Sequence, residues 1–436
     1  MILNLINMKY IFIVLIIITN FSSAKTEEIM IFLESAYKNN PKLNAERKNL
    51  NATKQNINIS RSEFLPTISV TGSIDGAQST NRTNRSGADM IDTQNDAKTK
   101  KISIDQKIFQ GLQGYNSLKK SELEVKKANS NLKKIEQETL LSAASAYFDL
   151  IYRIKNKKFN LENINLFERQ VESDSARLQK GEITYTDLAQ SESSLAGAKA
   201  KLIAAETKLL TTKANFERII RIKAPNLDGN FNLNINLPNS LNETLELSKL
   251  NNPDLLVAKL DYEIAKRNLN IEKANFAPSA SINYSKSESK DFNSTIDQVD
   301  QESVKATLSW PIIKGGKNYS SIKKSQFKRG QSELIFQDTT NEVKTNAANA
   351  WSIYQSSESV LNATQAQVKA AEIANEGITL EYDSGNTRTT LELIQSRTLL
   401  LDAKTSNAKA ERDFFISKFK ILSIIGKLTL DNIKNS

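Results

Sequence analysis

Strict alternation of apolar and polar residues marks four short segments of the chain as β-strands. The alternation runs over 67–74 and 101–105, and again over 280–285 and 304–310. A period of two residues places apolar side chains on one face of a sheet and polar side chains on the other. The segments inside each pair, about 75–100 and 287–300, are rich in Asn, Ser, Thr, Asp and Gly, so we predict exposed loops there.

A spacing of three and four residues follows each strand pair and predicts very long helices. From Leu118 to Ala146 the seam residues recur at this coiled-coil spacing, and many are small, which favours close packing of several helices. No Gly interrupts the chain between Tyr115 and Lys180. The predicted helices are 115–178, a return over 186–222 after a break at Gly181, 317–383, and a return over 389–425 after a break at Gly385. Shorter helices are predicted over 42–61 and 254–274.

These elements occur twice because the sequence is duplicated. Asn39-Asn40-Pro41 recurs at 251–253, and Phe64-Leu65-Pro66 recurs as Phe276-Ala277-Pro278. Farther on, Gly181 corresponds to Gly385, with one residue, Asn386, inserted just after it. We therefore divide the mature chain into a first structural repeat (25–225), a linker (226–240), a second structural repeat (241–426) and a C-terminal tail (427–436).

The first residues are typical of an export signal. Met8-Lys9-Tyr10 precedes an aliphatic run over 11–19, and small residues stand at Ser22 and Ala24. We predict a signal peptide over 1–24. No later segment supplies the roughly 18 consecutive apolar residues that a membrane-spanning helix needs, so entry into a membrane would require β-strands.

Composition narrows the chemistry. The chain has no Cys and no His, which removes thiol nucleophiles, disulfides and His-based acid–base or metal sites. The formal net charge is +10, but Lys and Arg are interspersed with Glu, so we expect no nucleic-acid partner. We expect neither an enzyme nor a bound cofactor or metal.

Four strands per chain have a consequence for assembly. A sheet in lipid cannot keep open edges, and closed membrane barrels have at least about eight strands, so one chain cannot close a barrel. Three chains would supply twelve strands. The alternative is a soluble sheet with one face covered by helices; the export signal and the placement of Tyr284 and Trp310 favour the membrane.

An ordered set of motifs resembles the TolC-type outer membrane efflux protein family over almost the whole mature chain. The motifs are Asn39–Pro41, Phe64–Pro66, Ala146–Leu150, Leu308–Gly316 and Tyr382–Leu393. The resemblance implies a mainly α fold with membrane β: a trimeric 12-stranded outer membrane β-barrel, four strands per chain, that continues into a long periplasmic α-helical coiled-coil barrel.

It also implies a function: an exit duct of a tripartite efflux pump or type I secretion system. The implied partners are two further copies of the chain, a periplasmic adaptor protein, an inner membrane transporter of RND or ABC type, and outer membrane lipid. The competing hypothesis is a structural coiled-coil protein of the envelope without channel activity.

The family closes its periplasmic aperture with links between helix ends. By position, Asp187 would pair with Tyr382 and Thr186 with Arg388. Glu392 matches a lining acid, and Gln395 stands where some members carry a second acid. Gly181 and Gly385 would be the helix tips that meet the adaptor. The alternative for these residues is ordinary coiled-coil surface.

Overall fold

The computed structural model describes residues 24–76, 78–83, 85–94, 97–225, 235–292, 296–384 and 388–434. The predicted signal peptide lies outside these residues except for Ala24, with which the first described helix begins. The elements in chain order are α2 (Ala24–Asn39), α3 (Pro41–Ser62), β1 (Thr67–Asp75), β2 (Gln78–Thr83), β3 (Asp89–Gln94), β4 (Ala97–Gln110), α4 (Gln113–Gln179), α5 (Tyr185–Ile220), α6 (Leu241–Asn251), α7 (Pro253–Ala274), β5 (Ser279–Lys290), β6 (Gln298–Ser309), α8 (Lys317–Asp383), α9 (Thr390–Ile424) and α10 (Leu430–Lys434).

The structure confirms the long helices predicted from the spacing of three and four residues. α4 and α8 each contain 67 residues, and the returning helices α5 and α9 contain 36 and 35. None of the helices among the described residues has both the length and the apolar content that crossing a membrane requires. Three helices were missed from the sequence: α2, α6 and α10.

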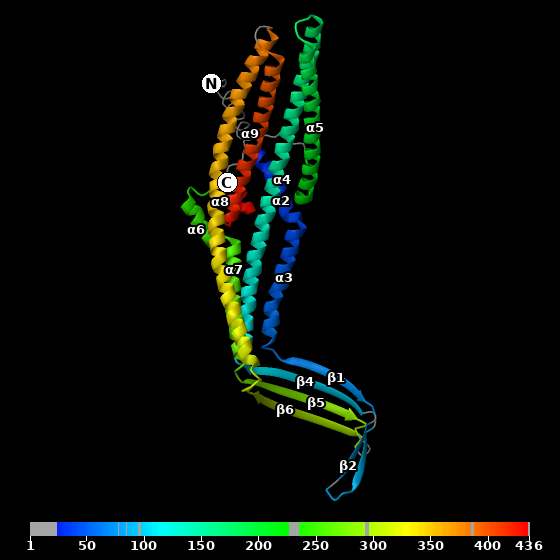
Figure 1. Ribbon diagram of the computed structural model, residues 1–436. Helices are drawn as coiled ribbons and strands as arrows, with labels where there is room; N and C mark the ends of the chain where they lie inside the picture. The colour runs from blue at the N-terminus through cyan, green and yellow to red at the C-terminus, as the bar shows by residue number, and fades with distance from the viewer. Residues whose placement is uncertain are drawn as a thin grey trace, which may run out of the picture. The chain divides into compact units, whose positions relative to one another are not determined.

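The chain forms two compact units, and each draws on both sequence repeats. The first unit comprises 1–47, 131–255 and 339–436, and the second comprises 48–130 and 256–338. The second unit contains the sheet. The first contains the ends of both long helical hairpins, in which α5 lies along α4 and α9 lies along α8 (Figure 1).

The second unit is built on an antiparallel sheet of four strands in the order β1-β4-β5-β6 (Figure 1). The two strand pairs from the two repeats meet where β4 pairs with β5, and a register shift interrupts that pairing between Lys107 and Phe109. β1 and β6 are the edges, so each carries a backbone row without a neighbouring strand in the described sheet.

The register confirms that the sheet has two chemically different faces. Val70 lies opposite Ile102, and Ile104 lies opposite both Ile68 and Tyr284. One face of the sheet is therefore apolar in this part of the strands. That face is uncovered: Val70 is 74% exposed. Residues that pair directly across neighbouring strands share a face, so the intervening residues form the other one.

The other face is polar and internally bonded. The hydroxyls of Ser69 and Ser103 are 2.8 Å apart, those of Ser285 and Ser303 are 3.0 Å apart, and Asn283 donates to Asp105 over 2.6 Å. The soluble alternative placed the apolar face on helices. The structure leaves that face open instead, as a membrane sheet requires.

The prediction of a plain loop over 75–100 is wrong in part. A second, two-stranded sheet pairs β2 with β3 in that interval. β5 extends to Lys290 and β6 begins at Gln298, so the second loop is also shorter than predicted. Polar strands without an apolar face leave no alternation in the sequence from which they could be recognised.

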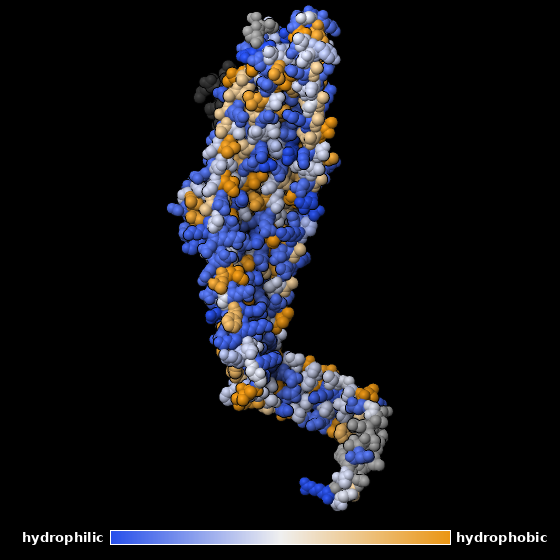
Figure 2. Space-filling model, in the orientation of Figure 1, coloured by the Kyte–Doolittle hydropathy of each residue, from blue (hydrophilic) through white to orange (hydrophobic). Residues whose placement is uncertain are grey.

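The first unit has a continuous aromatic and aliphatic core. Phe32 of α2 packs its ring edge against Phe216 of α5, with centroids 5.3 Å apart. Phe148 of α4 stacks on Phe415 of α9, also at 5.3 Å. The missed helices α2 and α10 belong to this core, which is why short, weakly amphipathic segments are helical here. Outside it, the helices show separate hydrophobic patches on a largely hydrophilic surface (Figure 2).

Candidate functional site at the ends of the helical hairpins

α4 ends at a glycine, as predicted from the sequence. Gly181 has φ +74°, a left-handed conformation that glycine adopts without strain. Its backbone N–H donates to Leu178 O over 2.9 Å, and Glu182 N–H donates to Arg177 O over 3.0 Å. These bonds satisfy carbonyls that the helix end would otherwise leave free, so the chain turns sharply at this point.

α5 begins with a capping box. The Thr184 hydroxyl accepts from the backbone N–H of Asp187, while the Asp187 carboxylate accepts from the Thr184 N–H over 2.9 Å and from the Thr184 hydroxyl over 2.7 Å. These hydrogen bonds lower the pKa of Asp187, and the bond from the Thr184 side chain has the largest effect. Thr186 lies exposed in the first turn.

α9 begins in the same way in the second repeat. Thr389 and Glu392 form the equivalent capping box, with the Thr389 N–H donating to Glu392 over 2.8 Å. Arg388 joins the end of α8 to the start of α9, because it donates to Glu381 over 2.6 Å and to Glu392 over 3.1 Å. Gln395 is exposed on α9. Gly385 and the inserted Asn386 lie outside the described residues.

Tyr382 of α8 is buried and contacts side chains of α4 and α9. Its side chain is 2% exposed, and its hydroxyl donates to Asp174 of α4 over 2.6 Å. The hydroxyl of Thr390 lies 3.1 Å from the same phenol oxygen. The Arg177 guanidinium lies 4.6 Å from the ring centroid. Burial, followed by the hydrogen bond to Asp174, raises the pKa of Tyr382, so its phenol stays protonated as a donor.

The structure therefore gives the predicted linking residues other partners within the chain. Tyr382 donates to Asp174 and not to Asp187, whose Oδ2 accepts the bonds of the α5 capping box. Arg388 pairs with two glutamates and not with Thr186, because those carboxylates offer it charged acceptors close in sequence.

The most buried polar residues of this region were not predicted from the sequence. Asp174 and Ser191 are completely buried, and Gln170 and Thr390 nearly so. A signal was available: Asp174 occupies an apolar seam position of α4, in the series Ile164, Phe167, Val171, Asp174, Leu178. A carboxylate at such a position must find hydrogen-bond donors from neighbouring helices.

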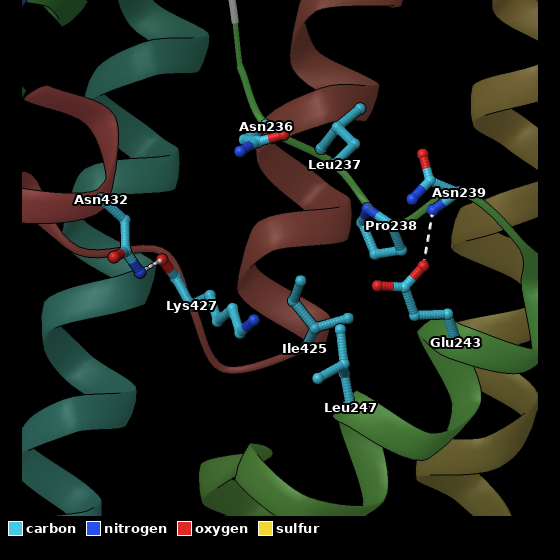
Figure 3. A pocket seen from close by; sticks show the side chains of 9 residues that line it. All are labelled: Asn236, Leu237, Pro238, Asn239, Glu243, Leu247, Ile425, Lys427 and Asn432. Atoms are coloured by element: carbon cyan, nitrogen blue, oxygen red, sulfur yellow. Dashed lines mark hydrogen bonds between the residues drawn. The ribbon is translucent and has the colours of Figure 1, made fainter. Parts of the chain in front are cut away.

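The first unit also contains a cavity, away from the hairpin ends. A cavity of about 350 Å³ lies where the segment 236–239 and α6 meet the end of α9 (Figure 3). Two of its polar groups are engaged locally: Asn239 N–H donates to Glu243 over 2.8 Å, and the Asn432 amide donates to Lys427 O over 2.7 Å. These bonds stabilise a helix start and a chain turn.

Fold and site together define a class. Strands with one open apolar face and helical hairpins with internally bonded ends are typical of a membrane channel protein. The family model described as "Outer membrane efflux protein" matches residues 32–220 and 244–427. The chain belongs to this family. It is an outer membrane exit duct that extends into the periplasm.

Known relatives span nearly the whole chain. The "Outer membrane efflux protein BepC" of Brucella suis biovar 1 (strain 1330) is 26% identical over 412 residues, which cover 94% of this chain and 88% of the relative. The "Outer membrane protein TolC" of Escherichia coli (strain K12) is 23% identical over 430 residues, covering 94% and 85%. The solved outer-membrane channel OprN has a TM-score of 0.80 at 15% identity, covering 92% of this chain and 91% of that one. The expected four-stranded sheet and helical hairpins are thereby confirmed.

Proposed function

We propose that three copies of this chain assemble into one passive duct. The observation that carries the proposal is the sheet: its apolar face is open, and its edges β1 and β6 lack partners within the described residues. Pairing β6 of one copy with β1 of the next closes a barrel of twelve strands from three chains. Closure removes the edges and turns the apolar face to outer membrane lipid.

The partners are a periplasmic adaptor protein and an inner membrane transporter of RND or ABC type. The family description and the name of the Brucella relative, which both specify efflux, support this part of the proposal. The adaptor would meet the helix ends at Gly181 and Gly385.

The hairpin ends would form the periplasmic aperture. Polar and charged groups gather there on the returning helices and just before α9: Thr186 and Asp187 on α5, Glu392 and Gln395 on α9, and Arg388 before α9. Gln395 is neutral, and Glu392 is already paired with Arg388. The acidic charge at this aperture is therefore lower than with an acid at both positions, which predicts weaker cation selectivity.

The test uses the full mature chain purified in detergent. We expect the mass of a trimer by light scattering, and stepwise ion conductance after insertion into planar bilayers. A stable monomer would contradict the barrel, because four strands cannot close. A trimer from outer membrane fractions that never conducts would favour the structural envelope protein instead.

A further inference from the structure

A single buried carboxylate joins three helices near the ends of the hairpins. Asp174 of α4 is completely buried. One of its oxygens accepts from Gln170 over 2.7 Å and from Tyr382 of α8 over 2.6 Å. The other oxygen accepts from Ser191 of α5 over 2.5 Å. The carboxylate thus ties both helices of the first hairpin to the outgoing helix of the second.

The donors are arranged so that the carboxylate cannot easily exchange them. Ser191 is completely buried and Tyr382 is 2% exposed, so water does not compete for either hydroxyl. The phenol has one proton, and donating it to Asp174 leaves the Thr390 hydroxyl of α9 to donate to the phenol oxygen. The chain of hydrogen bonds therefore reaches all four helices.

Two arginines reinforce the same junction between the hairpins. Arg177 lies over the Tyr382 ring and donates to Tyr382 O over 3.4 Å. Arg397 of α9 is 8% exposed and donates to Leu166 O of α4 over 3.0 Å. Both arginines cross from one hairpin to the other, so the two hairpins are held together at the level of Asp174.

We propose that Asp174 is the residue that positions the second hairpin against the first and thereby sets the width of the closed aperture. Asp187, to which the family resemblance gives a linking role, caps α5 within the described residues. The inference rests on the proposed duct with an aperture at the hairpin ends. The inference identifies the Asp174 carboxylate as the hydrogen-bond acceptor on which closure of that aperture depends.

The consequence of losing the acceptor follows from burial. Asp174→Ala leaves the hydroxyls of Ser191 and Tyr382 and the Gln170 amide buried without their common partner. Hydrogen bonds to a charged group are the stronger kind, and losing one shifts an equilibrium by roughly tenfold or more. Moving the hairpins apart lets water reach these groups, so the open arrangement gains population.

The experiment compares single-channel conductance of trimers in planar bilayers. We expect a clear increase for Asp174→Ala and a smaller one for Asp174→Asn, which keeps one carbonyl acceptor. Tyr382→Phe should raise conductance alone but add little to Asp174→Ala, because both changes break the same link. Asp187→Ala should have less effect than Asp174→Ala. Asp402→Ala, which removes an exposed carboxylate of α9, is the control and should leave conductance unchanged.

Parental conductance in an assembled Asp174→Ala trimer would overturn the inference and leave the duct itself intact. So would a larger effect of Asp187→Ala. If Asp174→Ala does not assemble, Asp174→Asn and Tyr382→Phe decide, because both nearly preserve the packing; parental conductance in both would overturn the inference. A parent protein that never conducts would instead overturn the proposed function.

Discussion

Glycines of the helical unit differ in what a side chain would meet. Gly426 ends α9 with φ +69°, and a methyl group there would collide with the backbone of Asn251 in α6. Gly377 lies within α8, and apart from the backbone of its own helix turn no described atom lies within 4 Å of such a methyl group. The first glycine is required by a close approach, whereas the second only weakens its helix.

Gly426→Ala should therefore destabilise the protein by about 2–4 kcal/mol, from the left-handed backbone and the collision together. Gly377→Ala should stabilise α8 by about 0.5–1 kcal/mol, because alanine is the better helix former. Denaturant unfolding of the trimer, followed by circular dichroism, measures both. Destabilisation by Gly377→Ala would instead mean that another chain packs closely against that helix face.

At the scale of elements, periodicity predicted the long helices to within a few residues. It placed the start of α4 at Tyr115, and the helix begins at Gln113; it placed the end of α8 at 383, where Asp383 ends it. β2 and β3 could not be predicted, since their pairing depends on backbone hydrogen bonds and not on an apolar face. The partner of Asp174 could not be predicted, because Tyr382 lies 208 residues farther along the chain.

The capping boxes should stabilise the first turns of α5 and α9. Thr184→Ala should cost α5 about 1 kcal/mol, seen as faster amide hydrogen exchange in its first turn. Hydrogen bonds lower the folded-state pKa of Asp187, chiefly from the Thr184 side chain, and of Glu392, chiefly from the Thr389 backbone. The stabilisation is therefore complete above the unfolded carboxyl pKa of about 4 and is lost as pH falls through the lower folded values.

Amide exchange at both helix starts, corrected for the intrinsic effect of pH, should consequently rise below about pH 4. Asp187→Asn removes the titrating group and should abolish this pH dependence in α5 while leaving that in α9. An unchanged pH dependence of α5 in this variant would show that another group is responsible.

In the whole molecule, the apolar and polar faces of the sheet determine which side chains contact lipid. Ile282 and Leu308 lie on the apolar face, and their sequence neighbours Ser281 and Thr307 lie on the polar face and pair with each other. The same substitution at adjacent positions therefore meets lipid in one case and the barrel interior in the other.

Ile282→Arg or Leu308→Arg should weaken membrane assembly by about 2–4 kcal/mol at the bilayer midplane. Ser281→Arg and Thr307→Arg are the matched controls and should assemble like the parent. The fraction of chain recovered as heat-resistant trimer from outer membranes is the measurement. Equal tolerance on the two faces would mean that the sheet does not lie in lipid.

Because each returning helix has its own capping box, the position at which it starts does not depend on the length of the turn before it. α5 and α9 each start at a threonine and an acid three residues later, although the second repeat carries one more residue before its cap. A helix whose first turn is specified by its own residues starts at the same place whatever connects it. Insertions at the tips can therefore change the surface of the tips without changing the helical framework that conducts.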